Sequence, residues 1–257
     1  MIMNKKGEIM FKKLFKKNNT NGHKRDYTNV IITDKSDFSL LEAYKTTRTN
    51  LTYSLMNFDD KCKKIIFTSS IPSEGKTVSC INTAIAFGMA GSKVLVIDAD
   101  LRKPKLHTCL GMSNEIGLTN YIAGMEKPSD VIRTTEYGVD CITAGHIPPN
   151  PSELLASPKM NELFIEASEK YDYIFIDMPP ATVVTDAVSL SKYVTGVILV
   201  VRQNYTNKDY LDKAISNLKF ANANILGILL NDVETSDRYY SSRYKYKKYS
   251  YKYRYYE

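Results

Sequence analysis

The sequence lacks several features that mark secreted and membrane-spanning proteins. Its four cysteines are scattered, with no C-x-x-C pair and no histidine at a metal-ligand spacing, which argues against a disulfide framework or a zinc site and predicts free thiols in a reducing cytoplasm. No run reaches 18 apolar residues, so we expect no transmembrane helix. The first residues also lack the apolar segment of a signal peptide. These absences predict a cytoplasmic protein.

The central part of the chain also lacks the positive charge that the whole sequence shows. The net charge is +7, but residues 1–25 carry eight Lys/Arg and one Glu, and residues 238–257 carry seven Lys/Arg and one Glu. The two ends therefore hold +7 and +6, which leaves −6 between them. A nucleic-acid-binding domain would need a basic face of its own, so we expect no nucleic-acid partner. Basic ends suit an anionic membrane surface, an acidic partner or the acidic centre of the chain itself.

The last twenty residues contain no Val, Ile or Leu, and their like charges repel, so they cannot bury enough apolar surface to fold. The sequence predicts a flexible C-terminal tail over 238–257 and a basic N-terminal arm over 1–35. Ile9–Lys17 of the arm alternates apolar residues with lysines, which fits either a solvated end or a contact with a membrane surface or partner. The tail offers many equivalent hydroxyl groups as phosphate acceptors: Tyr239, Tyr240, Tyr244, Tyr246, Tyr249, Tyr251, Tyr253, Tyr255 and Tyr256.

Residues 36–237 alternate apolar runs with helical patterns, which is typical of an α/β domain with a mostly parallel β-sheet and helices on both faces. We predict strands at 64–69, 93–98, 139–144, 171–177, 196–201 and 224–230. Helices are predicted at 38–57, 76–90, 117–123, 151–170 with a break at Pro158, 182–192 and 206–221.

A phosphate-binding loop follows the first predicted strand. Ser70-Ile-Pro-Ser-Glu-Gly-Lys76-Thr77 lies between a strand and a helix, although Ser70 replaces the usual first glycine. Backbone N–H groups at the start of the helix suit phosphate oxygens. Lys76 would reach the β- and γ-phosphates, and Thr77 would bind Mg²⁺. The predicted ATP-binding residues are Pro72, Ser73, Glu74, Gly75, Lys76, Thr77, Val78 and Asn231.

Three carboxylates end two other predicted strands, at the sheet edge where α/β proteins bind ligands. Asp98 and Asp100 follow one apolar run, and Asp177 follows another in a Walker-B-like pattern. We expect Thr77, Asp100 and Asp177 to hold Mg²⁺, directly or through water, and Asp98 to accept the proton of the nucleophile. Lys76, Asp98, Asp100 and Asp177 are thus the predicted catalytic residues. Asn231, after the last strand, either presents its amide to adenine or simply forms a turn.

Together these motifs resemble the bacterial tyrosine kinases (BY-kinases) of capsule and exopolysaccharide operons, over roughly residues 36–257. The similarity rests on Ser69–Thr77, Asp98–Arg102, Asp177-Met-Pro179, the loop Gly145–Leu155 and the tyrosine-rich tail. It implies a P-loop NTPase-like fold and an enzyme that uses ATP and Mg²⁺, autophosphorylates its tail and regulates polysaccharide synthesis and export.

The resemblance is to the cytoplasmic, Gram-positive type of this family, which implies several partners. These are a separate transmembrane activator that recruits the kinase to the inner face of the membrane, a cognate tyrosine phosphatase, and other copies of the chain in a ring-like oligomer that phosphorylates in trans. The family's ring-forming helix carries Glu-x-x-Arg-x-x-Arg, which corresponds here to Glu42, Lys45 and Arg48, so one arginine is a lysine. Lysine keeps the charge but loses the bidentate geometry of arginine.

Two other functions fit parts of the sequence. One is a partitioning or septum-positioning ATPase of the same P-loop class. That class has a signature lysine where this chain has Ile71, and it has no counterpart of the tyrosine-rich tail. The other is a nucleotide-gated regulator that binds a membrane partner and transfers nothing. Phosphotyrosine on the tail distinguishes the kinase from that regulator.

Overall fold

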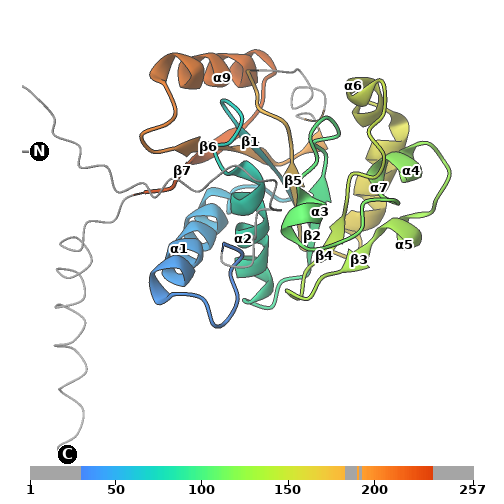
Figure 1. Cartoon of the computed structure of the whole chain (residues 1–257), viewed down its shortest axis with the longest axis horizontal. Coiled ribbons are helices and arrows are strands. Elements are labelled where there is room, and N and C mark those ends of the chain that lie inside the picture. Colours follow the sequence, from blue (N-terminus) through green and yellow to red (C-terminus); the bar gives the residue numbers. More distant parts are fainter. Residues whose placement is uncertain (1–29, 183–189, 191–192, 234–257) are drawn as a thin grey trace, which may run out of the picture.

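The computed structural model describes residues 30–182, 190 and 193–233. Within them lies a seven-stranded sheet in the order β3-β4-β2-β5-β1-β6-β7 (Figure 1). Neighbouring strands are parallel except for the antiparallel pair β3 and β4 at one edge. The strands are β1 (Lys63–Ser69), β2 (Val94–Asp98), β3 (Arg133–Thr134), β4 (Asp140–Ile142), β5 (Tyr173–Asp177), β6 (Gly196–Arg202) and β7 (Ile225–Asn231).

Helices cover both faces of the sheet, and each face has its own apolar core. One core includes side chains of α1 (Phe38–Ser54), α2 (Lys76–Gly88) and α3 (Leu106–Cys109). The other includes side chains of α4 (Leu118–Ile122), α5 (Pro128–Val131), α6 (Pro151–Leu155), α7 (Pro158–Ser168) and α9 (Lys208–Phe220). This arrangement confirms the predicted α/β class with helices on both faces.

The alternation of side chains along each strand explains why the strands read as continuous apolar runs. Ile65 and Phe67 of β1 join the core under α1 and α2, whereas Ile66 between them joins the opposite core. Because successive side chains of a strand point to opposite faces, a sheet covered on both sides needs apolar residues at every position.

The predicted elements agree with the structure in kind, and the chain breaks between α6 and α7 as Pro158 predicts. Three short elements, α3, α5 and β3, were not predicted, since two to four residues carry no readable periodicity. Most of the predicted helix 182–192 lies outside the described residues, as do the whole tail and residues 1–29. Among the described helices, none is long and apolar enough to cross a membrane.

The N-terminal end of the described chain packs on α2. Ile31 and Ile32, which the predicted boundary at residue 35 assigns to the arm, are 1% exposed. Asn82 of α2 accepts a hydrogen bond from the Ile32 N–H at 3.0 Å and donates one to the Val30 carbonyl at 2.8 Å. This pair of isoleucines therefore packs with the domain.

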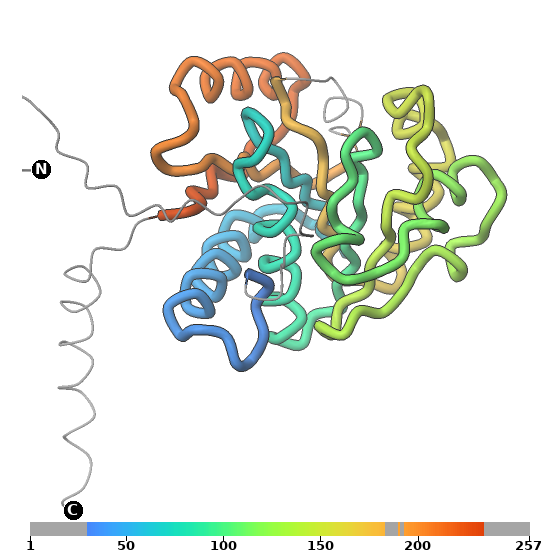
Figure 2. The backbone as a smooth tube through the Cα atoms, in the orientation of Figure 1, coloured from blue at the N-terminus to red at the C-terminus, as the bar shows by residue number. Residues whose placement is uncertain are grey.

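Figure 2 follows the chain from its blue start beside α2 to its red end after β7. Strand β7 is the edge strand opposite β3, so the chain reaches residue 233 at the far side of the sheet from α4 and α5. The P-loop lies between these edges, because β1 is flanked by β5 and β6.

Candidate active site

The loop between β1 and α2 adopts a backbone that few residues tolerate. Ser73 and Gly75 both have positive φ angles, 69° and 87°. A Cβ on Gly75 would lie 2.0 Å from Nδ2 of Asn231, so glycine is required here both by conformation and by space. Lys76 and Thr77 follow the loop and form the first turn of α2, where unpaired N–H groups favour anions.

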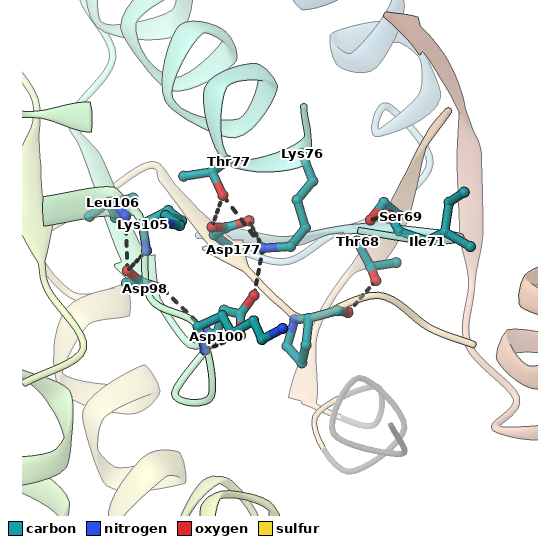
Figure 3. Close-up of polar contacts among 12 residues, drawn as sticks. Thr68, Ser69, Ile71, Lys76, Thr77, Asp98, Asp100, Lys105, Leu106 and Asp177 are labelled. Atoms are coloured by element: carbon teal, nitrogen blue, oxygen red, sulfur yellow. Dashed lines mark hydrogen bonds and ion pairs between the residues drawn. The ribbon is translucent and has the colours of Figure 1, made fainter. Parts of the chain in front are cut away.

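Of the three acidic residues predicted at two strand ends, Asp100 and Asp177 meet at Lys76 (Figure 3). The Lys76 ammonium lies 2.9 Å from Oδ2 of Asp100 and 3.0 Å from Oδ1 of Asp177. The Thr77 hydroxyl donates to Oδ2 of Asp177 at 2.6 Å. Asp98 and Asp177 lie side by side because β2 and β5 pair in register at these residues.

The buried charges of this cluster are balanced against one another. Burial disfavours the charged form of Lys76, but the carboxylates of Asp177 and Asp100 outweigh it, and the pKa of Lys76 is raised. Burial raises the pKa of Asp177, against the opposing influence of Lys76 and the Thr77 hydroxyl. The lysine is therefore a fixed cation between two acids.

Asp98, beside Asp177, does not pair with Lys76 but accepts hydrogen bonds from main-chain N–H groups. Its oxygens accept from Asp100 N at 3.2 Å, Lys105 N at 3.2 Å and Leu106 N at 3.0 Å. Burial and then the neighbouring carboxylate of Asp177 raise the pKa of Asp98 to about 8. This carboxyl shapes the loop after β2 and has a proton affinity far above that of an ordinary aspartate.

The oxygen donors of the cluster fit Mg²⁺ in combination with a nucleotide. Carboxylate and hydroxyl oxygens are hard ligands, and magnesium at phosphate sites commonly uses one or two carboxylates plus phosphates and water. Among the described residues, no three His, Cys, Asp or Glu side chains lie together as a metal-binding group. The residues therefore suit a metal that arrives with phosphate oxygens rather than one held by the protein alone.

Two of the predicted ATP-binding residues make contacts within the protein. The Glu74 side chain is 0% exposed and accepts hydrogen bonds from Ser70, Ile71 N and Thr206. Asn231 donates from Nδ2 to the Glu74 carbonyl at 2.9 Å, so its amide nitrogen faces the P-loop. Pro72 and Ser73 are exposed at the outer side of the loop.

The three residues predicted for the oligomer interface lie on α1. Lys45 pairs with Glu42 at 2.9 Å within the helix, and both side chains are largely accessible. Arg48 instead donates to the Ala86 carbonyl near the end of α2 at 2.8 Å. Their place in an interface stays a prediction.

Thr206 and Tyr205, in the loop between β6 and α9, contact the P-loop but were not predicted. Thr206 donates to Glu74, and the Tyr205 hydroxyl donates to the Pro72 carbonyl at 3.2 Å. Neither residue belongs to a local motif. The one available signal was the misfit of Glu74, an anion inside an anion-binding loop, which needs donors from elsewhere.

Residues 62–245 match the family model described as "ParA: NUBPL iron-transfer P-loop NTPase". Curated relatives are more specific. The chain is 38% identical over 196 residues to tyrosine-protein kinase YwqD of Bacillus subtilis, covering 76% of this chain and 82% of the relative. It is 35% identical over 214 residues to the putative tyrosine-protein kinase CapB of Staphylococcus aureus, covering 82% and 93%.

The chain belongs to the bacterial tyrosine kinases of capsule and exopolysaccharide synthesis. Solved structures agree with this assignment. The chimerical protein CapA2B2 has a TM-score of 0.73 and 34% identity, covering 78% of this kinase and 87% of that chain. The kinase domain of Escherichia coli ETK has a TM-score of 0.71 and 33% identity, covering 77% and 79%.

This kinase is thus a P-loop protein-tyrosine kinase rather than a septum-positioning ATPase. The septum site-determining protein MinD of Pyrococcus horikoshii, complexed with Mg-ADP, gives a lower TM-score of 0.57 at 30% identity, covering 69% of this kinase and 73% of that chain. The fold is one that uses nucleotide and magnesium in general.

Proposed function

We propose that this kinase transfers the γ-phosphoryl group of ATP to tyrosine hydroxyls, and that the nine tyrosines of residues 238–257 are among its acceptors. The observation that most supports this proposal is the Lys76 ammonium held between Asp100 and Asp177 at the start of α2. A cation at this point meets the charge that develops on a transferred phosphoryl group. The physiological role of the kinase is the regulation of capsular or exopolysaccharide synthesis and export.

Lys76 and its two carboxylate partners, Asp100 and Asp177, would change partners on substrate binding. Mg·ATP would supply the phosphoryl group and the metal charge that neutralises its β- and γ-oxygens. Lys76 would then contact the phosphates instead of its carboxylates, and Asp100 and Asp177, with Thr77, would hold the metal directly or through water. The ion pairs among these side chains hold them together at the place where the nucleotide would bind.

Asp98 is the proposed proton acceptor. As the tyrosine oxygen bonds to the γ-phosphorus, the bond from that phosphorus to the β–γ bridging oxygen breaks and ADP leaves. The hydroxyl proton passes to Asp98 in those molecules in which this carboxyl is ionised, because a pKa of about 8 leaves it mostly protonated at neutral pH. The pKa of Asp98, about 8, is closer to the pKa of tyrosine, about 10, than the pKa of an ordinary aspartate is. The smaller difference favours the proton transfer.

Kinetics of matched variants test these roles. Asp177→Asn should lower phosphotyrosine formation about 100-fold or more, because charge stabilisation at the transferred group is lost. Asp98→Asn should lower it by a similar factor as a proton acceptor is removed. Asp212→Asn, on the exposed side of α9, is the control. Wild-type rates in Asp98→Asn with loss in Asp177→Asn would refute the division of roles, and wild-type rates in both would refute the site.

The remaining partners are proposed on the family resemblance and the charge distribution. A separate transmembrane activator would bring the kinase to the inner face of the membrane, where the basic ends of the chain suit anionic lipids. A tyrosine phosphatase would reset the tail. Glu42, Lys45 and Arg48 are proposed to contact other copies in a ring in which one copy phosphorylates the tail of the next.

A further inference from the structure

We infer that Glu74 and Thr206 are positioning residues: a buried carboxylate and a distant hydroxyl that together hold the P-loop in its phosphate-binding shape. The inference rests on the nucleotide site proposed above. It assigns a role to two side chains whose polar atoms bond within the protein and which act through the loop.

Glu74 stands out because it is a buried anion in an anion-binding loop. Its side chain is fully buried, yet its donors are neutral: the Ser70 hydroxyl at 2.8 and 3.0 Å, the Ile71 N–H at 2.9 Å and the Thr206 hydroxyl. Among the described residues, no Lys, Arg or His forms an ion pair with it. A buried carboxylate is costly unless its hydrogen bonds are complete.

The hydrogen bonds to Glu74 decide which N–H groups of the loop face outward. The carboxylate takes the Ile71 N–H and so turns the start of the loop inward. The N–H groups of Ser73 and Gly75 have no hydrogen-bond acceptor within the described part of the chain, which leaves them for phosphate oxygens. Both residues adopt positive φ, a strained state for Ser73 that the surroundings must impose.

We call the hydrogen bonds that Glu74 accepts from Ser70, Ile71 and Thr206 the brace of the P-loop. Through Thr206 the brace depends on a segment 132 residues away in the chain. The Thr206 hydroxyl accepts from Arg202 N at 2.8 Å and donates to Glu74, so one oxygen links the end of β6 to the loop. Tyr205 adds a bond to the Pro72 carbonyl. Asn231 of β7 adds one to the Glu74 carbonyl at 2.9 Å. The loop is therefore held from outside by the ends of two neighbouring strands.

Positive φ angles recur at the segments that hold the P-loop. Four non-glycine residues of the described chain have positive φ, and three of them, Ser73, Asn204 and Asp232, lie in the P-loop, in the loop after β6 and just after β7. Asp232 is held there by an ion pair with Arg202 at 2.6 Å. Asn and Asp tolerate this left-handed conformation, whereas Ser73 is strained in it, which fits a P-loop whose shape is imposed by its surroundings.

Thr206 allows a test outside the P-loop. In the full chain, calorimetric titration with ADP and Mg²⁺ should show that Thr206→Val weakens binding about ten-fold, because a hydrogen bond to a charged acceptor is lost. Thr206→Ser keeps the hydroxyl and should stay within about two-fold of wild type. With ATP and a tyrosine substrate, Thr206→Val should raise KM while kcat is kept, since bound and transition-state phosphates lose the same support.

Equal ADP affinity in wild type and Thr206→Val would overturn the inference, as would a lower kcat with unchanged KM. If Thr206→Val does not fold, Glu74→Gln decides: it keeps the size of the side chain and should also weaken ADP binding, and wild-type affinity would refute the brace. A wild-type chain that binds ADP yet forms no phosphotyrosine would refute the kinase proposal and leave the brace standing.

Discussion

The carboxyl of Asp98 titrates far from its ordinary range, and this has a consequence for stability. Burial raises its folded-state pKa to about 8, whereas an unfolded aspartate titrates near 3.8. Between these values the folded protein binds one more proton than the unfolded chain, so the free energy of unfolding falls as pH rises. The slope is at most about 1.4 kcal/mol per pH unit for one group.

Chemical denaturation of the nucleotide-free and Mg²⁺-free kinase between pH 6.5 and 8 measures this slope. We expect stability to decrease across the window, with Asp177, whose pKa burial also raises, acting in the same direction. Asp98→Asn should flatten the dependence, since the titrating group is removed. Stability that is constant or that increases with pH in the wild type would contradict the described burial of Asp98.

Arg48 and Lys45 occupy the same helix but make different contacts, so their substitutions should differ. Arg48 donates to the Ala86 carbonyl, one of the last carbonyls of α2, where a positive charge is favourable. Arg48→Met should lower the free energy of unfolding by about 1–2 kcal/mol. Lys45→Met removes only an exposed pair and should change it by about 0.5 kcal/mol or less.

Denaturant unfolding of the two variants checks this difference, and light scattering of the same samples reports their assembly. Equal stability losses in both variants would refute the assigned link between α1 and α2. A fall in mass for both variants would support the proposed interface, and unchanged mass in both would count against it.

Elements and motifs of ordinary length were predictable because each carries its own local signal. The strand–loop–helix of residues 63–88 was readable from an apolar run followed by Gly75-Lys76-Thr77, and the helix break at Pro158 from the missing N–H of proline. The carboxylates at the ends of β2 and β5 were predicted to meet because parallel strands end at one edge.

What could not be predicted depends on contacts between distant residues. The donation from Thr206 to Glu74 spans 132 residues and no motif marks Thr206. Asn231 was expected near adenine or in a turn, and its bond to the Glu74 carbonyl follows only from the position of β7 beside β6. The boundary of the arm was placed at residue 35 from its basic composition, which did not reveal the buried pair Ile31 and Ile32.

We propose that the basic tail of one copy is phosphorylated in the acidic site of another copy. The described chain ends at residue 233 after the edge strand β7, whereas Lys76 begins α2, after the inner strand β1 and the P-loop. We expect a neighbour's tail to enter the site. Mixing a full-length Lys76→Met chain with an active chain lacking residues 238–257 should place phosphate on the Lys76→Met tail, and an unmodified tail would indicate transfer within one chain.

The central claim is that this kinase, through Lys76, phosphorylates tyrosines in the tail of residues 238–257 of its own copies. Intact-mass analysis of the chain, incubated with ATP and Mg²⁺ after phosphatase treatment, tests it most directly when wild type and Lys76→Met are compared. The account predicts several added phosphates in the wild type, all on residues 238–257 by peptide mapping, and none in Lys76→Met incubated alone. The same phosphotyrosine content in both proteins, or none in the wild type, would contradict it.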